Sequence, residues 1–476
     1  MEFREISSSS ASDTQLLRQF YAECLVTAFP DEDERESLEN IEKYLRLKED
    51  GKYGANNYHV IVACDGDKPI AGSIFDYLFE PNAGVIEFLL VNPGQRQGGL
   101  ASRLLRQTES AIAADAQRVG REVDWLVAEL DDPFRVSLAE SDFNPFTRAS
   151  IWHRWGYRML DFRYIQPALS PEKSPATTLL LAAKTLSPEL AESIPTARVL
   201  SFLREYMVWA MRIETPETDP VYREMADRLS GTGQPVALVD LGDYVGADGR
   251  DPRPRIEEVA DPDDPGLTAA TDVYSAVFTD PATAVSPAEF RRALSRKGIV
   301  EASGGRYHMW SIYRPGATRC EGMASFFALH SAGFGGYLGL IPPLRGSGQL
   351  SYLLARIERQ MVEDGTGARG LYLECAGQLE RDIFVKPRFG FYELDVPYTQ
   401  PAAASVTALA AERLHLLYKP FGRVYRQPEL STAGFLDAMR EIVTVVYGVE
   451  DADSSETYVQ LERSLAGCQR VPFAPG

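Results

Sequence analysis

Residues 88–105, FLLVNPGQRQGGLASRLL, predict a buried strand, a glycine-rich turn and an amphipathic helix in direct succession. The run from Phe88 to Val91 is apolar throughout, which is typical of a strand covered on both faces. Gly94, Gly98 and Gly99 leave backbone amides unshielded where the helix begins, and such a helix N-terminus binds anions. The turn is neither a Walker loop nor a dinucleotide-binding fingerprint, because no Gly-Lys-Ser/Thr follows and the glycine spacing differs.

The turn resembles motif A of the GNAT acyltransferases, R/Q-x-x-G-x-G/A, here Arg96-x-x-Gly99-x-Ala101. The resemblance implies that the loop amides bind the pyrophosphate of acetyl-coenzyme A and that the preceding strand meets its pantetheine arm. The cofactor-binding residues that it implies are Leu89, Leu90, Val91, Arg96, Gln97, Gly98, Gly99, Leu100, Ala101 and Ser102. The alternative is a strand–helix turn in which small residues only permit close packing.

The order of the expected elements around this stretch resembles the whole GNAT fold, an α/β fold with a mixed sheet. A strand at 3–6, two helices and a hairpin at 58–77 precede it, and a strand at 125–130 and a short helix at 150–155 follow it. Trp155-Gly156-Tyr157 is similar to the hydrophobic-Gly-Phe sequence that closes the last helix in that family.

The same order recurs in the second half of the chain. Tyr58-His59 returns as Tyr307-His308, a displacement of 307 − 58 = 249 residues. The same displacement relates Pro93, Arg96, Gly99 and Leu104-Leu105 to Pro342, Arg345, Gly348 and Leu353-Leu354. Self-similarity at a fixed displacement indicates tandem modules.

The repeat extends past the usual end of an acyltransferase into helices that start at Thr196 and Thr432. We therefore expect two GNAT modules in tandem, each with a C-terminal helical appendix whose apolar stripes serve core or inter-module packing. The expected boundaries are 1–168 for module 1, 169–245 for its appendix and connector, 246–404 for module 2 and 405–476 for the second appendix.

The composition of the chain limits the classes of partner and the cellular compartment that we expect. The chain of 476 residues has a net charge of −19, which disfavours nucleic acid and anionic lipid as partners. The negative charge would attract a cationic amine substrate, or it serves only to keep the protein soluble. Its five cysteines include no C-x-x-C pair, so we expect free thiols in the cytoplasm and no metal. No apolar run has the length of a membrane span, and Met1 to Glu5 does not begin a signal peptide.

Glu87 is the expected general base. It is the one charged residue in the run Val85 to Leu90, and many GNAT enzymes carry a catalytic glutamate on this strand. A carboxylate in an apolar strand is costly unless it has a role or a partner, so a satisfied structural carboxylate is the equal alternative. In the second copy Gly336 takes this position and the bulky Leu350 replaces Ala101, so module 2 is expected to be degenerate.

One residue departs from the family pattern. Counting back from Gly156 places Trp152 where the family has a tyrosine that acts as general acid, and an indole cannot fill that role. The adjacent His153 is expected to be structural or solvated.

The expected function is transfer of an acetyl or other acyl group from acetyl-CoA to a primary amine, in a small molecule or a peptide, by direct attack in a ternary complex. The alternative is a non-catalytic protein that binds acyl-CoA or acts as a scaffold. A tandem repeat also allows a monomer that imitates a dimer within one chain.

Overall fold

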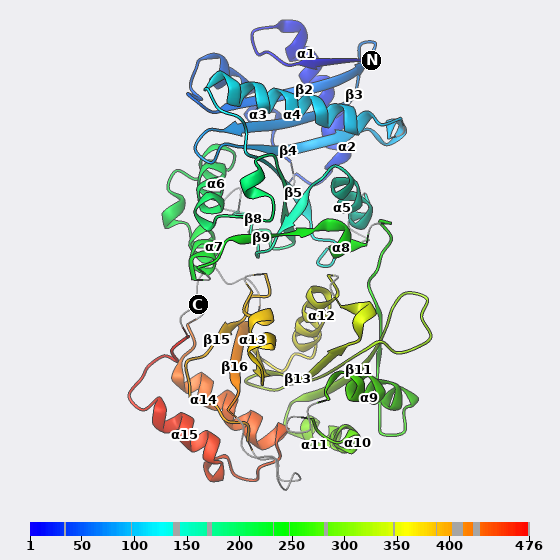
Figure 1. Cartoon of the computed structure of the whole chain (residues 1–476), viewed down its shortest axis with the longest axis vertical. Coiled ribbons are helices and arrows are strands. Elements are labelled where there is room, and N and C mark those ends of the chain that lie inside the picture. The colour runs from blue at the N-terminus through cyan, green and yellow to red at the C-terminus, as the bar shows by residue number, and fades with distance from the viewer. Residues whose placement is uncertain are drawn as a thin grey trace. The chain divides into compact units, whose positions relative to one another are not determined.

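The computed structural model describes residues 1–32, 35–96, 98–136, 143–168, 174–231, 233–246, 248–279, 284–345, 348–386, 388–401, 413–421 and 429–474. The chain forms two compact units (Figure 1). Unit 1 comprises Met1–Gly242 and Ala247–Gly249, and unit 2 comprises Asp243–Gly246 and Arg250–Gly476.

Among the described residues of unit 1, nine strands form one mixed sheet in the order β1-β2-β3-β4-β5-β7-β6-β9-β8. Within these described strands, only the β4–β5 pair is parallel. The strands are β1 (Glu2–Glu5), β2 (Asn57–Asp65), β3 (Lys68–Leu78), β4 (Ala83–Val91), β5 (Trp125–Asp131), β6 (Arg158–Leu160), β7 (Leu179–Thr185), β8 (Ser193–Ile194) and β9 (Val236–Asp240).

Helices cover both faces of this sheet. Ile112 of α4 packs on β4, where Gly84 is required because a Cβ there would lie 2.6 Å from the Ile112 Cδ1 atom. On the opposite face, Phe20 of α1 and Tyr44 of α3 share a core with Tyr58 of β2. The helical segments are α1 (Ala11–Phe20), η1 (Tyr21–Leu25), α2 (Val26–Ala28), α3 (Leu38–Glu49), η2 (Pro93–Gln95), α4 (Leu100–Arg118), α5 (Pro145–Arg154), η3 (Pro188–Leu190), α6 (Thr196–Trp209), η4 (Pro216–Thr218) and α7 (Pro220–Gly231). The boundary between the units falls within α8 (Leu241–Val245).

The described part of unit 2 repeats this plan with seven strands in the order β10-β11-β12-β13-β14-β16-β15. Its strands are β10 (Arg255–Glu258), β11 (Arg306–Tyr313), β12 (Gly322–Ala328), β13 (Gly333–Leu340), β14 (Gly370–Cys375), β15 (Tyr392–Glu393) and β16 (His415–Pro420). Its helical segments are α9 (Pro265–Val277), α10 (Pro287–Ser295), α11 (Lys297–Ala302), η5 (Pro342–Leu344), α12 (Gln349–Glu363), α13 (Gln378–Phe384), α14 (Thr432–Glu441), η6 (Ile442–Val446), η7 (Ala452–Ser454) and α15 (Glu456–Ser464).

The segments expected to be helical appendices also supply strands to the sheets. β7 inserts between β5 and β6, and β9 pairs with β6, so residues 169–245 complete the sheet of unit 1. β16 inserts between β14 and β15 in the same way. The segments expected to be helical appendices therefore contain strands of the sheets as well as helices. No helix in the described ranges is long and apolar enough to cross a membrane.

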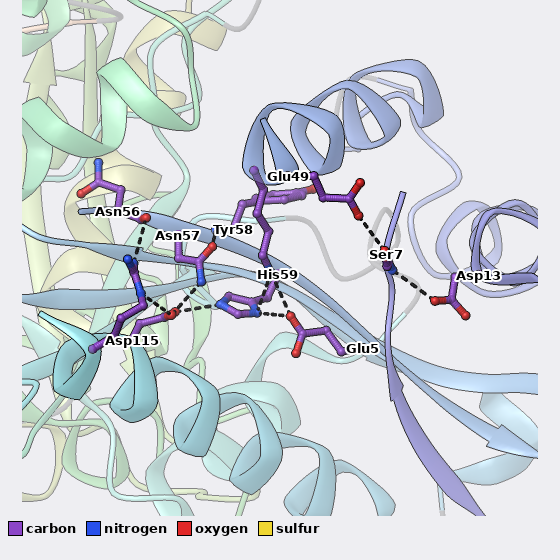
Figure 2. A network of polar contacts seen from close by, with 11 residues as sticks. Glu5, Ser7, Asp13, Glu49, Asn56, Asn57, Tyr58, His59 and Asp115 are labelled. Carbon is purple, nitrogen blue, oxygen red and sulfur yellow. Dashed lines mark hydrogen bonds and ion pairs between the residues drawn. The ribbon is translucent and has the colours of Figure 1, made fainter. Parts of the chain in front are cut away.

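In each unit a histidine of the sheet lies between two carboxylates. His59 Nδ1 lies 2.7 Å from a Glu5 oxygen, and His59 Nε2 lies 2.7 Å from an Asp115 oxygen (Figure 2). Burial alone would lower the pKa of His59, but the hydrogen bonds to the two carboxylates outweigh it and raise that pKa. His308 of unit 2 bridges Glu258 and Asp364 at 3.2 and 3.0 Å. The repeated histidine is therefore an ion-paired clamp and not only a packing residue.

Candidate functional site

The strands β4 and β5 separate in the middle of the sheet. Their parallel pairing runs from Ala83 opposite Trp125 to Ile86 opposite Ala128 and stops there, although both strands continue. Beyond this point Leu89, Leu90 and Val91 stay paired with β3 on one side only. Their backbone groups on the β5 side have no strand partner among the described residues, so the sheet is open where an extended ligand can bind.

The glycine turn lies at the end of this opening. Gly98 and Gly99 have φ angles of +85° and +70°, a left-handed conformation that favours glycine. Gly99 is the N-cap of α4 and no side chain caps the helix, so the amides of the first turn, which includes Leu100, Ala101 and Ser102, have no side-chain partner at the cap. Gln97 lies outside the described residues.

Two side chains hold the turn in place. Arg96 donates from Nε to the Val91 carbonyl at 3.3 Å, and its guanidinium carbon lies 4.8 Å from the ring centroid of Phe143. Ser102 Oγ accepts a hydrogen bond from Trp155 Nε1 at 2.9 Å, which fixes the start of α4 to the end of α5. The turn is thus anchored by side chains, while no side chain caps the helix that follows it.

Glu87 occupies a β-bulge at the point where the strands separate. Ile86 lies opposite Phe75 of β3 and Phe88 lies opposite Ile74, so Glu87 is an extra residue without a partner in the ladder. A bulge re-aims the side chain that it carries. The Glu87 carboxyl is hydrogen-bonded to that of Asp76, a residue of β3 that is 3% exposed.

These two carboxyls titrate as a pair. Burial raises the pKa of Asp76 to about 6 against the opposing effect of its hydrogen bond to Glu87. Burial, followed by the charge of Asp76, raises the pKa of Glu87 well above its usual value. Two like charges at hydrogen-bond distance cannot both ionise easily, so the ionisation of one carboxyl opposes the ionisation of the other.

Aromatic side chains surround the carboxyl pair. The ring of Tyr58 lies 5.6 Å from that of Tyr44 and 6.2 Å from that of Tyr53 between centroids. Tyr53 stacks on Trp209, the last residue of α6, at 5.3 Å. The buried Tyr58 hydroxyl has no hydrogen-bond partner in the described part of the chain. Such a hydroxyl, next to a carboxyl pair, offers a polar group to a ligand.

Glu129 of β5 lies one residue beyond the last parallel pair, on the other side of the opening. It accepts hydrogen bonds from the Tyr164 hydroxyl and from Gln166 Nε2, the latter at 2.9 Å. Tyr206 of α6 also lowers the pKa of Glu129. Burial raises the pKa of Glu129 to about 6 although these hydrogen bonds lower it. The opening between the strands therefore has a carboxyl group on each side.

Trp152 and His153 take structural positions. Trp152 is 7% exposed and packs edge-on against Trp155 at 5.3 Å and Tyr157 at 4.6 Å. His153 Nδ1 lies 3.1 Å from an Asp240 oxygen of β9. Sequence reasoning missed Asp76 of β3, Tyr206 of α6 and Arg212, which follows α6 and donates to the Tyr53 hydroxyl. Asp76 had the same signal as Glu87, since it is the one charge inside the strand Pro69 to Leu78.

Unit 2 keeps the scaffold but lacks both members of the carboxyl pair. Gly336 is its bulged residue, because Gly335 lies opposite Phe326 and Tyr337 lies opposite Ser325. His308 faces Phe326 as His59 faces Phe75, so Asp76 corresponds to Phe327. The Glu129 cluster is retained, since Glu374 accepts hydrogen bonds from the hydroxyls of Tyr398 and Tyr447.

Comparison with known proteins gives one family and several similar structures. Residues 15–141 match the family model described as the acetyltransferase (GNAT) family. No match was found among curated proteins. A protein from Bacteroides thetaiotaomicron assigned to the GNAT family is 20% identical, with 45% of this chain and 99% of that chain covered and a TM-score of 0.32.

Two further solved structures are similar to part of the chain. The aminoglycoside 6'-N-acetyltransferase from Enterococcus faecium is 16% identical, with 40% of this chain and 98% of that chain covered and a TM-score of 0.27. The ribosomal-protein-alanine N-acetyltransferase from Brucella melitensis is 19% identical, with 39% of this chain and 100% of that chain covered and a TM-score of 0.26.

Proposed function

We propose that unit 1, whose residues 15–141 carry a GNAT acetyltransferase domain, transfers an acetyl group from acetyl-CoA to a primary amine. The observation that carries the proposal is the position of Glu87, on a bulge where β4 and β5 separate and beside the buried Asp76. A carboxyl group with a raised pKa beside an open strand edge has the properties of a catalytic group.

Different residues of the site are proposed to bind acetyl-CoA, to deprotonate the amine and to protonate the leaving thiolate. The amides of the first turn of α4 and the open edge of Leu89 to Val91 are the proposed binding groups for acetyl-CoA, which supplies the activated acyl group. An amine attacks only in its neutral form, and the ionised member of the Asp76–Glu87 pair removes its proton. The leaving thiolate needs a proton, which Trp152 cannot supply. The groups that donate hydrogen bonds to Glu129, on the other side of the opening, are the proposed source of that proton.

Unit 2 is proposed to be a non-catalytic copy, because Phe327 and Gly336 stand where unit 1 has its two carboxyls. We also propose the segment boundaries 1–168, 169–245, 246–404 and 405–476. We further propose that the protein is a monomer that imitates a dimer within one chain, and that it is located in the cytoplasm. The location is supported by five free cysteines, of which only Cys468 is exposed. No nucleic acid partner is proposed for a chain of charge −19.

The test has a binding step and a rate step. Calorimetric titration with acetyl-CoA is expected to show one site per chain, and thiol release with a panel of primary amines is expected to identify an acceptor. Glu87→Gln should lower kcat by about a hundredfold or more, because a positioned general base contributes about 10²–10⁴. Acetyl-CoA affinity should not change.

The matched control is Glu23→Gln, which removes an exposed carboxylate of unit 1 that bonds only Gln19 among the described residues. It should leave kcat unchanged. Normal turnover by Glu87→Gln would overturn the role of Glu87. Binding of acetyl-CoA without transfer to any amine would support the alternative, a protein that binds acyl-CoA without catalysis.

A further inference from the structure

Helix α6, which lies outside the matched residues 15–141, forms a wall of the site. Phe202 packs on Trp125 of β5 with ring centroids 5.2 Å apart, Tyr206 lowers the pKa of Glu129, and Trp209 stacks on Tyr53. Residues spaced by three or four lie on one face of a helix, so this face of α6 points at the sheet where the carboxyl pair lies. Its last turn brings the following residues to the same place.

Arg212 follows α6 in an unusual backbone conformation. Its φ angle of +58° is left-handed, a strained conformation for a residue with a Cβ that persists where the surroundings fix it. The guanidinium carbon lies 4.1 Å from the ring centroid of Tyr44, and Nη2 donates to the Tyr53 hydroxyl at 3.2 Å. The backbone strain thus places a cation over the tyrosines that surround the carboxyl pair.

Arg212 has no carboxylate within ion-pair distance in the described ranges of the chain. A guanidinium has five N–H donors, and tyrosine hydroxyls take only part of them. The residue is exposed, so the remaining donors face solvent. Arginine binds carboxylate and phosphate groups through two parallel hydrogen bonds, and a guanidinium already fixed on two tyrosines loses little freedom in doing so.

We propose that the amine acceptor also carries a carboxylate or phosphate group, that Arg212 binds this anion, and that the aromatic wall of Tyr53 and Trp209 packs against the part between the anion and the amine. The amine is then directed at Glu87 and Asp76. This proposal rests on the proposed acetyltransferase function and adds its substrate class. Residues from beyond the matched region would set the specificity of the site.

Paired acceptors test the proposal. Thiol release from acetyl-CoA is measured with lysine against cadaverine, tyrosine against tyramine, and phosphoethanolamine against ethanolamine. At least one anion-bearing member is expected to have a kcat/KM about tenfold to a hundredfold above that of its neutral partner, as a charge-assisted hydrogen bond provides. The first two pairs report on carboxylate and the third on phosphate.

Arg212→Gly separates recognition from folding, because glycine accepts a φ of +58° without strain and the variant should remain folded. It is expected to abolish the preference for the anion-bearing acceptor by raising KM, and Arg212→Lys is expected to restore part of it. The control is Arg204→Gln, on the same helix, whose side chain is paired with Glu205 and Glu217. It should keep the preference.

Equal kcat/KM values within every pair would overturn the proposal, and so would a preference that is unchanged in Arg212→Gly. Transfer to any of these amines would still support the acetyltransferase function. Absence of transfer to every amine by the unaltered protein would instead overturn the proposed function, and the substrate class would fall with it.

Discussion

Replacing Asp76 by asparagine should stabilise unit 1 in neutral and alkaline solution. The pKa of Asp76 is raised from 3.8 to about 6 in the folded protein, chiefly by burial. A carboxyl whose folded pKa lies above its unfolded pKa destabilises the fold when it ionises. A rise of this size corresponds to about 3 kcal/mol, because one pKa unit is about 1.4 kcal/mol. Asparagine keeps the shape and does not ionise.

The gain should therefore depend on pH with a definite sign. Below about pH 4, aspartic acid is neutral in both states and the variant should match the original protein. The difference should grow between about pH 4 and 6 and reach about 3 kcal/mol at pH 8. For a unit of this size each kcal/mol moves the melting temperature by about 2–4 °C, so we expect a rise of about 6–12 °C at pH 8.

Thermal unfolding of both proteins at pH 4 and pH 8 measures this difference. The matched control is Asp115→Asn, the same substitution at a buried carboxylate that is paired with His59, which should destabilise unit 1. A loss of stability in Asp76→Asn at pH 8, or an equal change at both pH values, would refute the argument. Asp76→Asn should also lower the pKa of Glu87, so the acidic limb of the pH–rate profile should move to lower pH.

Two further predictions concern the turn and the histidine clamp. Gly99→Glu should weaken acetyl-CoA binding at least about a hundredfold in calorimetry, since it sets a negative charge against a phosphate site; Gly120→Glu, also left-handed, should have no such effect. His59→Asn should lower the unfolding free energy by about 3–5 kcal/mol at pH 6, as loss of one partner of a buried ion pair does. The raised pKa of His59 means that this contribution is complete below about pH 6.5 and is lost as pH rises through the folded pKa, so the deficit should shrink at pH 9. His308→Asn should lower the unfolding free energy by less, because the contacts of His308 are longer. A larger loss of unfolding free energy would contradict this reasoning.

The local parts of this fold could be predicted from the sequence. The strand, turn and helix of residues 88–105 appear as β4, the glycine turn and α4, because apolar runs, glycines and helical periodicity act over a few residues. The GNAT fold predicted from motif A is confirmed for residues 15–141 by the family match.

The missed parts depend on contacts between distant segments. Asp76 meets Glu87 only because a bulge shifts the register of β4, and no periodicity shows where a bulge will occur. Arg212 lies beside Tyr53, which is 159 residues earlier in the chain. β7 takes its place in the sheet next to β5, and its apolar run alone did not indicate that neighbour.

The insertion of β7 between β5 and β6 also determines when β5 can be paired during synthesis of the chain. When β5 leaves the ribosome, one of its edges has no partner until Thr185 has been made, 54 residues after Asp131. At about 5–20 residues per second, that edge has no partner for roughly 3–11 s. An unpaired apolar strand in a nascent chain is a template for aggregation. The ribosome-bound chain should therefore be most dependent on chaperones during the interval in which β5 waits for β7.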